Sequence, residues 1–180
     1  MRKSIVFSIV LLFAFGSFAQ NKVKVNSVKE ESSITYSMTH PLHAWQGESK
    51  EVNSILLMDE AKTTIFQVAV SAKLSSFDSK NANRDSHMIE VTEALKFPNV
   101  TYSSTSVNIE GAEFTSSGNL TFHGISQPVA IKGTFTKDGT KLIFSGSFNL
   151  KMTQFKIEPP SLMGISTNDD FKLDFKIVYQ

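Results

Sequence analysis

The sequence predicts an all-β fold in one domain. Apolar and polar side chains alternate with a period of two in several separate runs, as expected for antiparallel strands with one dry and one wet face. Turn-forming residues separate these runs, and Asp138-Gly139 is a good hairpin signal. Apolar residues at helical spacing occur in one short segment only. We therefore expect a single all-β domain with one short helical excursion near residues 86–95.

The first nineteen residues are predicted to be a signal peptide. Arg2 and Lys3 precede the apolar run Ile5–Phe15, and the small residues Ser17 and Ala19 suit a signal peptidase, so we expect cleavage after Ala19. The run is shorter than the roughly 20 apolar residues that span a bilayer. The remaining segment, 20–180, has the size of one domain with one core. We expect the mature protein to be periplasmic or secreted.

Charge and cysteine content exclude several classes of function. Without the signal peptide the chain carries 16 basic and 17 acidic side chains, a balance that gives no electrostatic footprint for nucleic acid. The chain has no cysteine, so disulfides, thiolate nucleophiles and zinc–sulfur sites are absent. Stability must then come from hydrophobic burial, to which the fifteen phenylalanines contribute.

Eight or more strands are expected from the alternation and from the turn residues that bound each run. In the clearest example, Leu142, Phe144 and Phe148 share one face while Ser145 and Asn149 share the other. The expected strands are Lys22–Val28, Ser33–His40, Val52–Met58, Phe66–Lys73, Val100–Val107, Val129–Thr136, Leu142–Leu150 and Phe171–Tyr179.

One segment, Ser86–Leu95, is predicted to be helical. Met88, Val91 and Leu95 fall on one helix face. Asp85 is a plausible N-cap residue, and a proline three residues beyond the segment ends it.

Periodicity alone does not separate a β-sandwich from a barrel. A closed barrel of about eight strands removes exposed edges and is just wide enough inside to be filled by side chains or to hold one small ligand. Gly133 and Gly146 lie in mid-strand, where a glycine marks either a bend in a packed core or a close approach by a ligand. Both interpretations stay open at this point.

Three motifs are long and unusual. The first comprises Phe77-Asp78-Ser79, Asn81, Asn83-Arg84-Asp85 and His87-Met88, followed by Lys96-Phe97-Pro98, and a later one is Gly118-x-Leu120-Thr121-x-x-Gly124 with Pro128-Val129. With these motifs the chain, from about Val25 to Tyr179, resembles the YceI-like family, periplasmic lipocalin-like β-barrels that hold a long isoprenoid or other lipid chain. The third motif, His40–Gly47, departs from the commonest version in the family, which has one histidine and more small residues.

The resemblance implies a single antiparallel lipocalin-like barrel with an open interior that binds one long amphiphilic lipid without catalysis. It implies a polyisoprenoid, such as an isoprenoid quinone precursor or a prenyl phosphate, with fatty acids or amides as near alternatives. The sequence is also compatible with transient membrane contact and with a homodimer. The inward-facing candidates for the cavity wall are Tyr36, Met38, Phe66, Val68, Val70, Leu120, Phe122, Ile131, Phe144, Phe148, Leu173 and Phe175. The candidates for the mouth, near the head group, are His40, His43, Trp45, Asn83, Arg84 and His87.

The polar loop that precedes the predicted helix has two interpretations. Asn81, Asn83 and Asp85 suit a turn held by side-chain hydrogen bonds, with Arg84 forked onto the carboxylate of Asp78 or Asp85. Alternatively, Arg84 and Asn83 face the barrel mouth and bind a polar or phosphorylated head group.

Two rival functions remain. The four histidines suggest a metal- or haem-associated redox partner, with His40 and His43 three residues apart. However, His123 has the opposite parity to Leu120 and Phe122 and should point outward, so we predict no metal site and no cofactor. The second rival is a filled barrel acting as a ligand-free interaction or stress protein. Catalytic signatures such as G-x-S-x-G, H-E-x-x-H and G-x-G-x-x-G are absent from the sequence, so we predict no catalytic residues.

Overall fold

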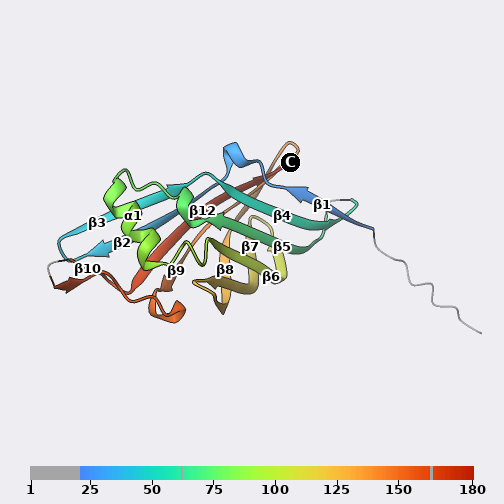
Figure 1. The fold of residues 1–180 in the computed structure, drawn as a ribbon. Coiled ribbons are helices and arrows are strands. Elements are labelled where there is room, and N and C mark those ends of the chain that lie inside the picture. The colour runs from blue at the N-terminus through green and yellow to red at the C-terminus, as the bar shows by residue number, and fades with distance from the viewer. Residues whose placement is uncertain (1–20, 62, 163) are drawn as a thin grey trace, which may run out of the picture.

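The computed structural model describes residues 21–61, 63–162 and 164–180. The predicted signal peptide, residues 1–19, and its cleavage after Ala19 lie outside the described residues. The predicted all-β, lipocalin-like fold is confirmed: within these ranges one strongly curled antiparallel sheet carries ten strands, with a separate two-stranded ribbon at one end (Figure 1). Besides the eight strands named from the sequence, the sheet contains β3, His43–Ser49, and β7, Glu113–Phe122.

The remaining elements follow the predicted order closely. The other strands of the sheet are β1 Lys22–Asn26, β2 Ser33–His40, β4 Val52–Asp59, β5 Ile65–Lys73, β6 Asn99–Glu110, β8 Ile125–Asp138, β9 Lys141–Lys151 and β12 Asp170–Tyr179. The ribbon consists of β10 Ser161–Leu162 and β11 Ile165–Ser166. The helical elements are η1 Lys29–Glu31, η2 Leu74–Ser76, α1 Ala82–Val91 and η3 Thr153–Phe155. Across the sheet the strand order is β1-β4-β5-β6-β7-β8-β9-β12-β2-β3.

Isolated backbone bridges draw the two edges of the sheet round into a barrel. Ser27, just after β1, bridges to Tyr179 at the end of β12. Near the other end of the barrel, Glu48 of the edge strand β3 bridges to Asp78, which follows β5 and η2. Both backbone hydrogen bonds of the second bridge form, at 3.1 and 2.9 Å. These contacts satisfy part of the backbone that two free edges would leave unpaired.

Aromatic rings lie against glycines of neighbouring strands, which explains the mid-strand glycines better than either sequence interpretation. Gly133 and Gly146 face each other across β8 and β9. Their other cross-strand partners are Phe114 and Phe175, whose rings occupy the space that a Cβ would need. A glycine in the wall therefore lets a ring lie close to the sheet rather than project into the interior.

The helix begins four residues earlier than predicted. Asn81, not Asp85, is the N-cap, and its side chain accepts a hydrogen bond from the Arg84 amide at 3.1 Å, as an N-cap amide oxygen does for the third helical residue. The helix ends at Val91 because Glu93 adopts a left-handed conformation, with φ of 46°. Leu95, expected on the helix face, is instead 95% exposed. No helix in the described ranges is long and apolar enough to cross a membrane.

Two of the sequence motifs pack on each other although they are far apart in the chain. Gly124 has φ of 71°, and the Phe97 ring fills the space beside its Cα. The preceding His123 lies edge-on to Phe97, with ring centroids 5.1 Å apart. Its ring nitrogens lie 2.9 Å from the Phe155 carbonyl and 2.7 Å from a Glu93 carboxylate oxygen. As predicted, His123 does not border the barrel interior, but it is a largely buried tie between three loops rather than an exposed side chain.

Candidate functional site: an apolar cavity

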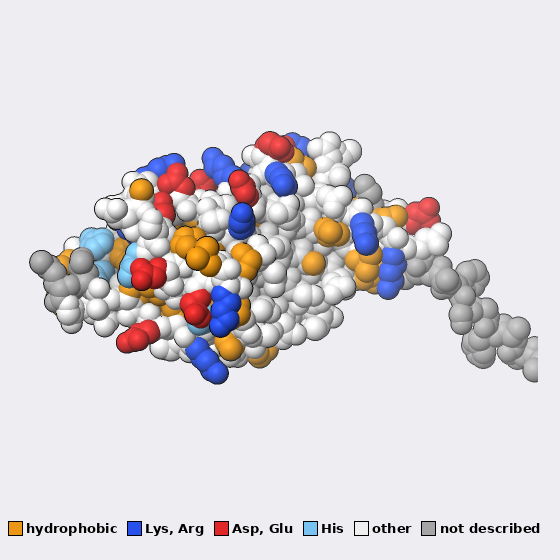
Figure 2. Space-filling model, in the orientation of Figure 1, with side chains coloured by type: hydrophobic (Ala, Val, Ile, Leu, Met, Phe, Trp, Pro, Cys, Tyr) orange, Lys and Arg blue, Asp and Glu red, His pale blue; other side chains and the backbone are white. Residues whose placement is uncertain are grey.

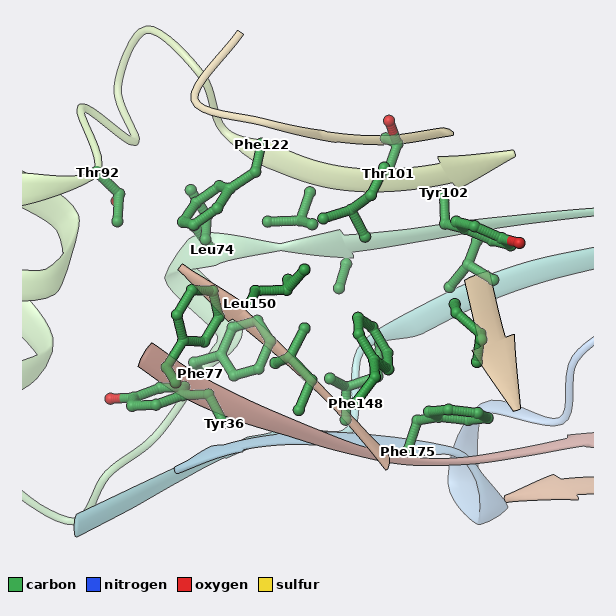
Figure 3. A pocket seen from close by; sticks show the side chains of 18 of the residues that line it. Tyr36, Leu74, Phe77, Thr92, Thr101, Tyr102, Phe122, Phe148, Leu150 and Phe175 are labelled. Atoms are coloured by element: carbon green, nitrogen blue, oxygen red, sulfur yellow. The ribbon is translucent and has the colours of Figure 1, made fainter. Parts of the chain in front are cut away.

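A cavity of about 220 Å³ lies inside the barrel (Figure 3). Inward-facing side chains such as Val68, Val70 and Leu173 are only half-buried although they point away from the outer surface. Side chains that filled the interior would cover one another, as they do in a close-packed core. The barrel is therefore hollow, which contradicts the filled-barrel alternative.

Eleven of the twelve predicted wall residues border this cavity. They come from six strands distributed around the barrel, so that the wall is apolar on every side. They are Tyr36, Met38, Val68, Val70, Leu120, Phe122, Ile131, Phe144, Phe148, Leu173 and Phe175.

Phe66 was predicted to line the cavity and does not. The pairing of β4 with β5 shifts register, so that Leu57 pairs with Gln67 but Met58 pairs with Ile65. Phe66 is therefore the extra residue of a bulge, which reverses the inward–outward alternation at that point. Ile65 takes the buried position, and the Phe66 ring lies beneath the Lys22 ammonium at 4.8 Å.

Several wall residues were not predicted as such. Phe114 keeps the parity of the predicted inward residues Leu120 and Phe122 in β7, so alternation could have identified it. Tyr102 lies in β6, for which no inward-facing residue was predicted. Leu74 and Phe77 belong to or adjoin a short 3-10 turn, and Ile157 lies in a loop, where periodicity gives no signal. Two apolar residues of the helix, Met88 and Val91, also border the cavity.

Two tyrosines that border the cavity have paired hydroxyl groups. The Tyr102 hydroxyl lies 2.7 Å from Ser116 Oγ, and the Tyr179 hydroxyl lies 2.5 Å from Ser54 Oγ. Both phenols are buried, and burial raises their pKa above the ordinary value. They therefore remain protonated and satisfied at neutral pH, leaving this part of the wall without an unpaired polar group.

The opposite end of the cavity lies beneath α1 and is chemically different. Within the described ranges Arg84 is the only arginine, lysine or carboxylate side chain that borders the cavity, and His87 is the only histidine; both are on this helix. The Arg84 guanidinium lies over the Trp45 ring at 5.2 Å, and its Nη1 donates to the Ser79 carbonyl at 3.3 Å. Asp85 accepts from the Ser79 amide at 3.1 Å, so Arg84 does not form the predicted fork onto Asp78 or Asp85.

Tyr36 also belongs to this end of the cavity. Its ring packs against Phe77 at 5.7 Å and lies over Gly47, directly opposite it on β3. Tyr36 is 9% and Ser79 8% exposed, and neither side-chain oxygen forms a hydrogen bond within the described residues, although the Tyr36 hydroxyl lies close to the Trp45 and Ser79 side chains. Burial raises the pKa of the Tyr36 hydroxyl and the Asp85 carboxylate raises it further, while Trp45, Arg84 and Ser79 lower it. We call Tyr36, Trp45, Ser79 and Arg84 the mouth cluster.

Three of the six predicted mouth residues do not border the cavity. His40 is 2% exposed; its Nδ1 accepts from the Leu42 amide at 3.2 Å, so Nε2 donates to the Ile165 carbonyl at 3.0 Å. The ribbon thus covers His40, which ties β2 to β11. His43 is exposed beside it, and Asn83 is exposed on the first turn of α1. Trp45, Arg84 and His87 do border the cavity.

The described part of the outer surface shows neither a metal-binding cluster nor, on the face in Figure 2, a patch of charges of one sign. Within the described ranges no three His, Asp or Glu side chains gather as a metal site would require. On the face shown in Figure 2, acidic and basic side chains lie side by side rather than in patches of one sign. The cavity is therefore the candidate functional site.

Sequence comparisons agree with the geometry. A profile of the YceI-like domain family matches residues 25–179. The protein YceI of Salmonella newport strain SL254 is 29% identical over 156 residues, an alignment that covers 82% of each chain. The protein YceI of Salmonella arizonae matches with the same identity and coverage.

Solved structures share the fold at lower identity. Burkholderia cenocepacia BcnA has a TM-score of 0.75 and 18% identity, with 86% of this chain and 99% of that chain covered. A domain from Saccharophagus degradans, described as polyisoprenoid-binding and implicated in plant cell wall breakdown, has a TM-score of 0.69 and 13% identity, with 86% and 97% covered. The Campylobacter jejuni YCEI protein has a TM-score of 0.62 and 21% identity, with 74% and 84% covered.

Proposed function

The chain belongs to the YceI-like domain family, and from this premise we propose that it is a non-enzymatic lipid carrier that holds one long-chain amphiphile in the barrel interior. The observation that carries the proposal is the hollow, almost wholly apolar cavity. A polyisoprenoid is the preferred cargo, because the similar Saccharophagus domain is described as binding polyisoprenoids. We propose that the carrier acts outside the cytoplasm, after removal of the predicted signal peptide.

The physical basis of binding would be shielding of the lipid chain from water. Burial of each methylene contributes about 0.8 kcal/mol, so ten carbons would contribute about 8 kcal/mol before the cost of ordering the chain. Small-molecule sites generally combine such an apolar wall with a few polar groups that fix orientation. In this barrel Arg84 and His87 are at the α1 end, so the polar head would lie there and the chain would extend toward Tyr102.

The direct test is native mass spectrometry of protein purified gently from the periplasm, followed by organic extraction. We expect an additional mass of a few hundred daltons that passes into the organic phase and is identified there as a lipid. Ligand-stripped protein should take up an added C20 prenyl alcohol at one molecule per chain. Bare polypeptide that takes up no prenyl chain would refute the proposal.

A pair of neighbouring substitutions tests where the lipid lies. Val70 borders the cavity, whereas Ala69 on the same strand is exposed outside it. Val70→Trp should occupy the interior and lower lipid uptake at least tenfold, while Ala69→Trp adds a similar ring to the outer face and should leave uptake unchanged. Equal uptake by the two variants would place the lipid elsewhere.

A further inference from the structure

Two large aliphatic side chains are exposed at the same end of the barrel. Leu42 is 61% and Ile165 is 42% exposed. Leu42 lies in the two-residue turn between His40 and His43, a position at which asparagine, aspartate and glycine are usual. A single exposed aliphatic residue is ordinary on a protein surface. Two that lie together need a physical reason.

The buried ring of His40 ties these two residues to each other. Its Nδ1 accepts from the Leu42 amide at 3.2 Å, and its Nε2 donates to the Ile165 carbonyl at 3.0 Å. A further hydrogen bond joins the segment after the ribbon to β2, from the Asn168 amide to the Thr39 carbonyl at 2.9 Å. Figure 1 shows the turn between β2 and β3 beside the ribbon, at the end of the barrel where α1 lies. We call this surface the apolar tip; it consists of Pro41, Leu42 and Ile165.

The apolar tip lies on two segments without fixed charge. Neither residues 40–47 nor residues 159–168 include a lysine, arginine, aspartate or glutamate. The first charged residues along the chain beyond these segments are all acidic: Glu31, Glu48, Glu158 and Asp169. Surfaces that bind anionic lipids or nucleic acids carry clusters of lysine and arginine instead. The apolar tip therefore fits a partner that is held by burial of apolar surface and not by charge.

The apolar tip adjoins the cavity. The His43 ring lies between those of His40 and Trp45, with centroids 5.5 and 5.2 Å apart. Trp45 borders the cavity, as does Pro160, immediately before the ribbon. Each of the two segments that form the tip thus also contributes to the cavity wall. Tryptophan is enriched where proteins meet the interface of a membrane.

We propose that the apolar tip docks the protein on a zwitterionic phospholipid bilayer, with Leu42 and Ile165 inserted among the lipids. This inference rests on the proposed carrier function and adds the surface at which cargo is exchanged. A second protein fits less well, because a stable protein interface covers about 800 Å² on each partner, far more than two side chains offer. A bilayer accepts single aliphatic side chains, each of which contributes in proportion to its buried area. Lipid would then pass between the bilayer and the cavity along Trp45.

The first test is flotation of ligand-stripped protein with two kinds of vesicle, phosphatidylcholine alone and phosphatidylcholine mixed with an equal part of phosphatidylglycerol. We expect the bound fractions to agree within about twofold and to resist added salt, because salt screens charges but not apolar contacts. Binding to the anionic vesicles alone would overturn the inference.

Matched serine variants identify the docking residues. Leu42→Ser and Ile165→Ser should each lower the partition coefficient about five- to tenfold, as loss of one inserted aliphatic side chain predicts. The control is Ile55→Ser on β4, because Ile55 is 40% exposed, almost the same as Ile165. It should bind vesicles like wild type. All three residues are exposed, so the urea midpoint should stay unchanged. Equal losses in Ile165→Ser and Ile55→Ser would overturn the assignment.

Uptake of the C20 prenyl alcohol without vesicles separates docking from the carrier function. Leu42→Ser should take up the alcohol like wild type but transfer it to vesicles more slowly. If wild type takes up the alcohol but does not float, docking fails and the carrier proposal stands. If it floats but takes up no alcohol, docking stands and the carrier proposal fails. A dimer in light scattering that Leu42→Ser dissociates would assign the tip to a second copy of the chain and overturn docking.

Discussion

The three tyrosines that border the cavity divide it into two regions. At one end, Tyr102 and Tyr179 are paired with Ser116 and Ser54, and their hydroxyls join strands of the barrel to one another. At the α1 end, Tyr36 is somewhat less buried, and its hydroxyl lies near the Trp45 and Ser79 side chains without forming a hydrogen bond to either. The same side chain therefore serves the fold in one region and remains available in the other. Substitutions at the paired end should cost stability, whereas those at the α1 end should change which lipid is bound.

The largest effect is expected from Phe144→Arg. Phe144 lies 5.8 Å from Tyr179 and 5.2 Å from Phe114, in the aromatic cluster of the paired end. An arginine there would bury an unpaired charge, which is expected to cost several kcal/mol of stability and to abolish lipid uptake. Uptake and the urea midpoint are both measured. Ile143→Thr, on the opposite face of the same strand, is the control and should retain uptake; equal loss in both variants would contradict the assigned facing.

Gly47→Ala should have the next largest effect. A Cβ at Gly47 would overlap the Tyr36 ring and no backbone atom among its nearest neighbours. Overpacking of this kind costs about 1–3 kcal/mol, and the displaced ring would disturb the mouth cluster. We expect a lower urea midpoint together with reduced uptake of the added C20 prenyl alcohol. A variant with wild-type stability and wild-type uptake would show that Tyr36 is not held in place by this contact.

Two hydroxyl deletions compare the regions directly. Tyr179→Phe breaks a hydrogen bond in the core and should destabilise the protein by about 1 kcal/mol. Tyr36→Phe removes a hydroxyl without a partner and should leave the stability of the lipid-free protein unchanged or slightly higher. Chemical unfolding of both variants, each stripped of lipid, measures the difference. If both variants lost the same free energy of unfolding, the hydroxyls at the two ends of the cavity would contribute equally to stability, and the proposed difference between the ends would be wrong.

The smallest expected effect is on the pH dependence of stability, through Asp59. Hydrogen bonds from the Thr64 amide, the Thr63 hydroxyl and the Thr63 amide hold the pKa of Asp59 below its ordinary value of 3.8. A lowered folded-state pKa stabilises the protein above the unfolded value, and this contribution is lost as the pH falls through the folded value. Asp59→Asn should therefore be less stable than wild type near neutrality, and the gap should narrow below about pH 4. A gap that stays constant between about pH 6 and pH 3 would contradict this cause.

The fold could be predicted largely because strand alternation is a local property. Each of the eight predicted strands corresponds to a strand of the structure, and the Asp138-Gly139 turn joins β8 to β9 with Gly139 at φ of 57°. The failures occur where local periodicity is interrupted. Phe66 keeps the parity of Val68 in the sequence, but the bulge beside it depends on pairing with β4, which the sequence of one strand does not reveal.

The α1 end could be predicted only in part. Trp45, Arg84 and His87 were identified from two unusual motifs, and they do border the cavity. The same reasoning included His40, which the ribbon covers, because the return of residues 161–166 across β2 is a long-range contact. It did not find Ser79, whose burial depends on the backbone bridge between Asp78 and Glu48. Contacts between distant segments, rather than residue chemistry, decided these outcomes.

The glycines of the wall help to set the inner width of the barrel. At Gly118, Gly133 and Gly146 an added methyl group would meet backbone atoms as well as an aromatic ring. The inner width in the middle of the barrel is therefore fixed by the backbone of the sheet. At Gly47 the nearest atoms that it would meet all belong to the Tyr36 side chain. Single substitutions could therefore change the size of the cavity next to α1 while the inner width in the middle of the barrel stays constant. Related proteins could in this way adapt to new head groups without changing the length of lipid chain that they accept.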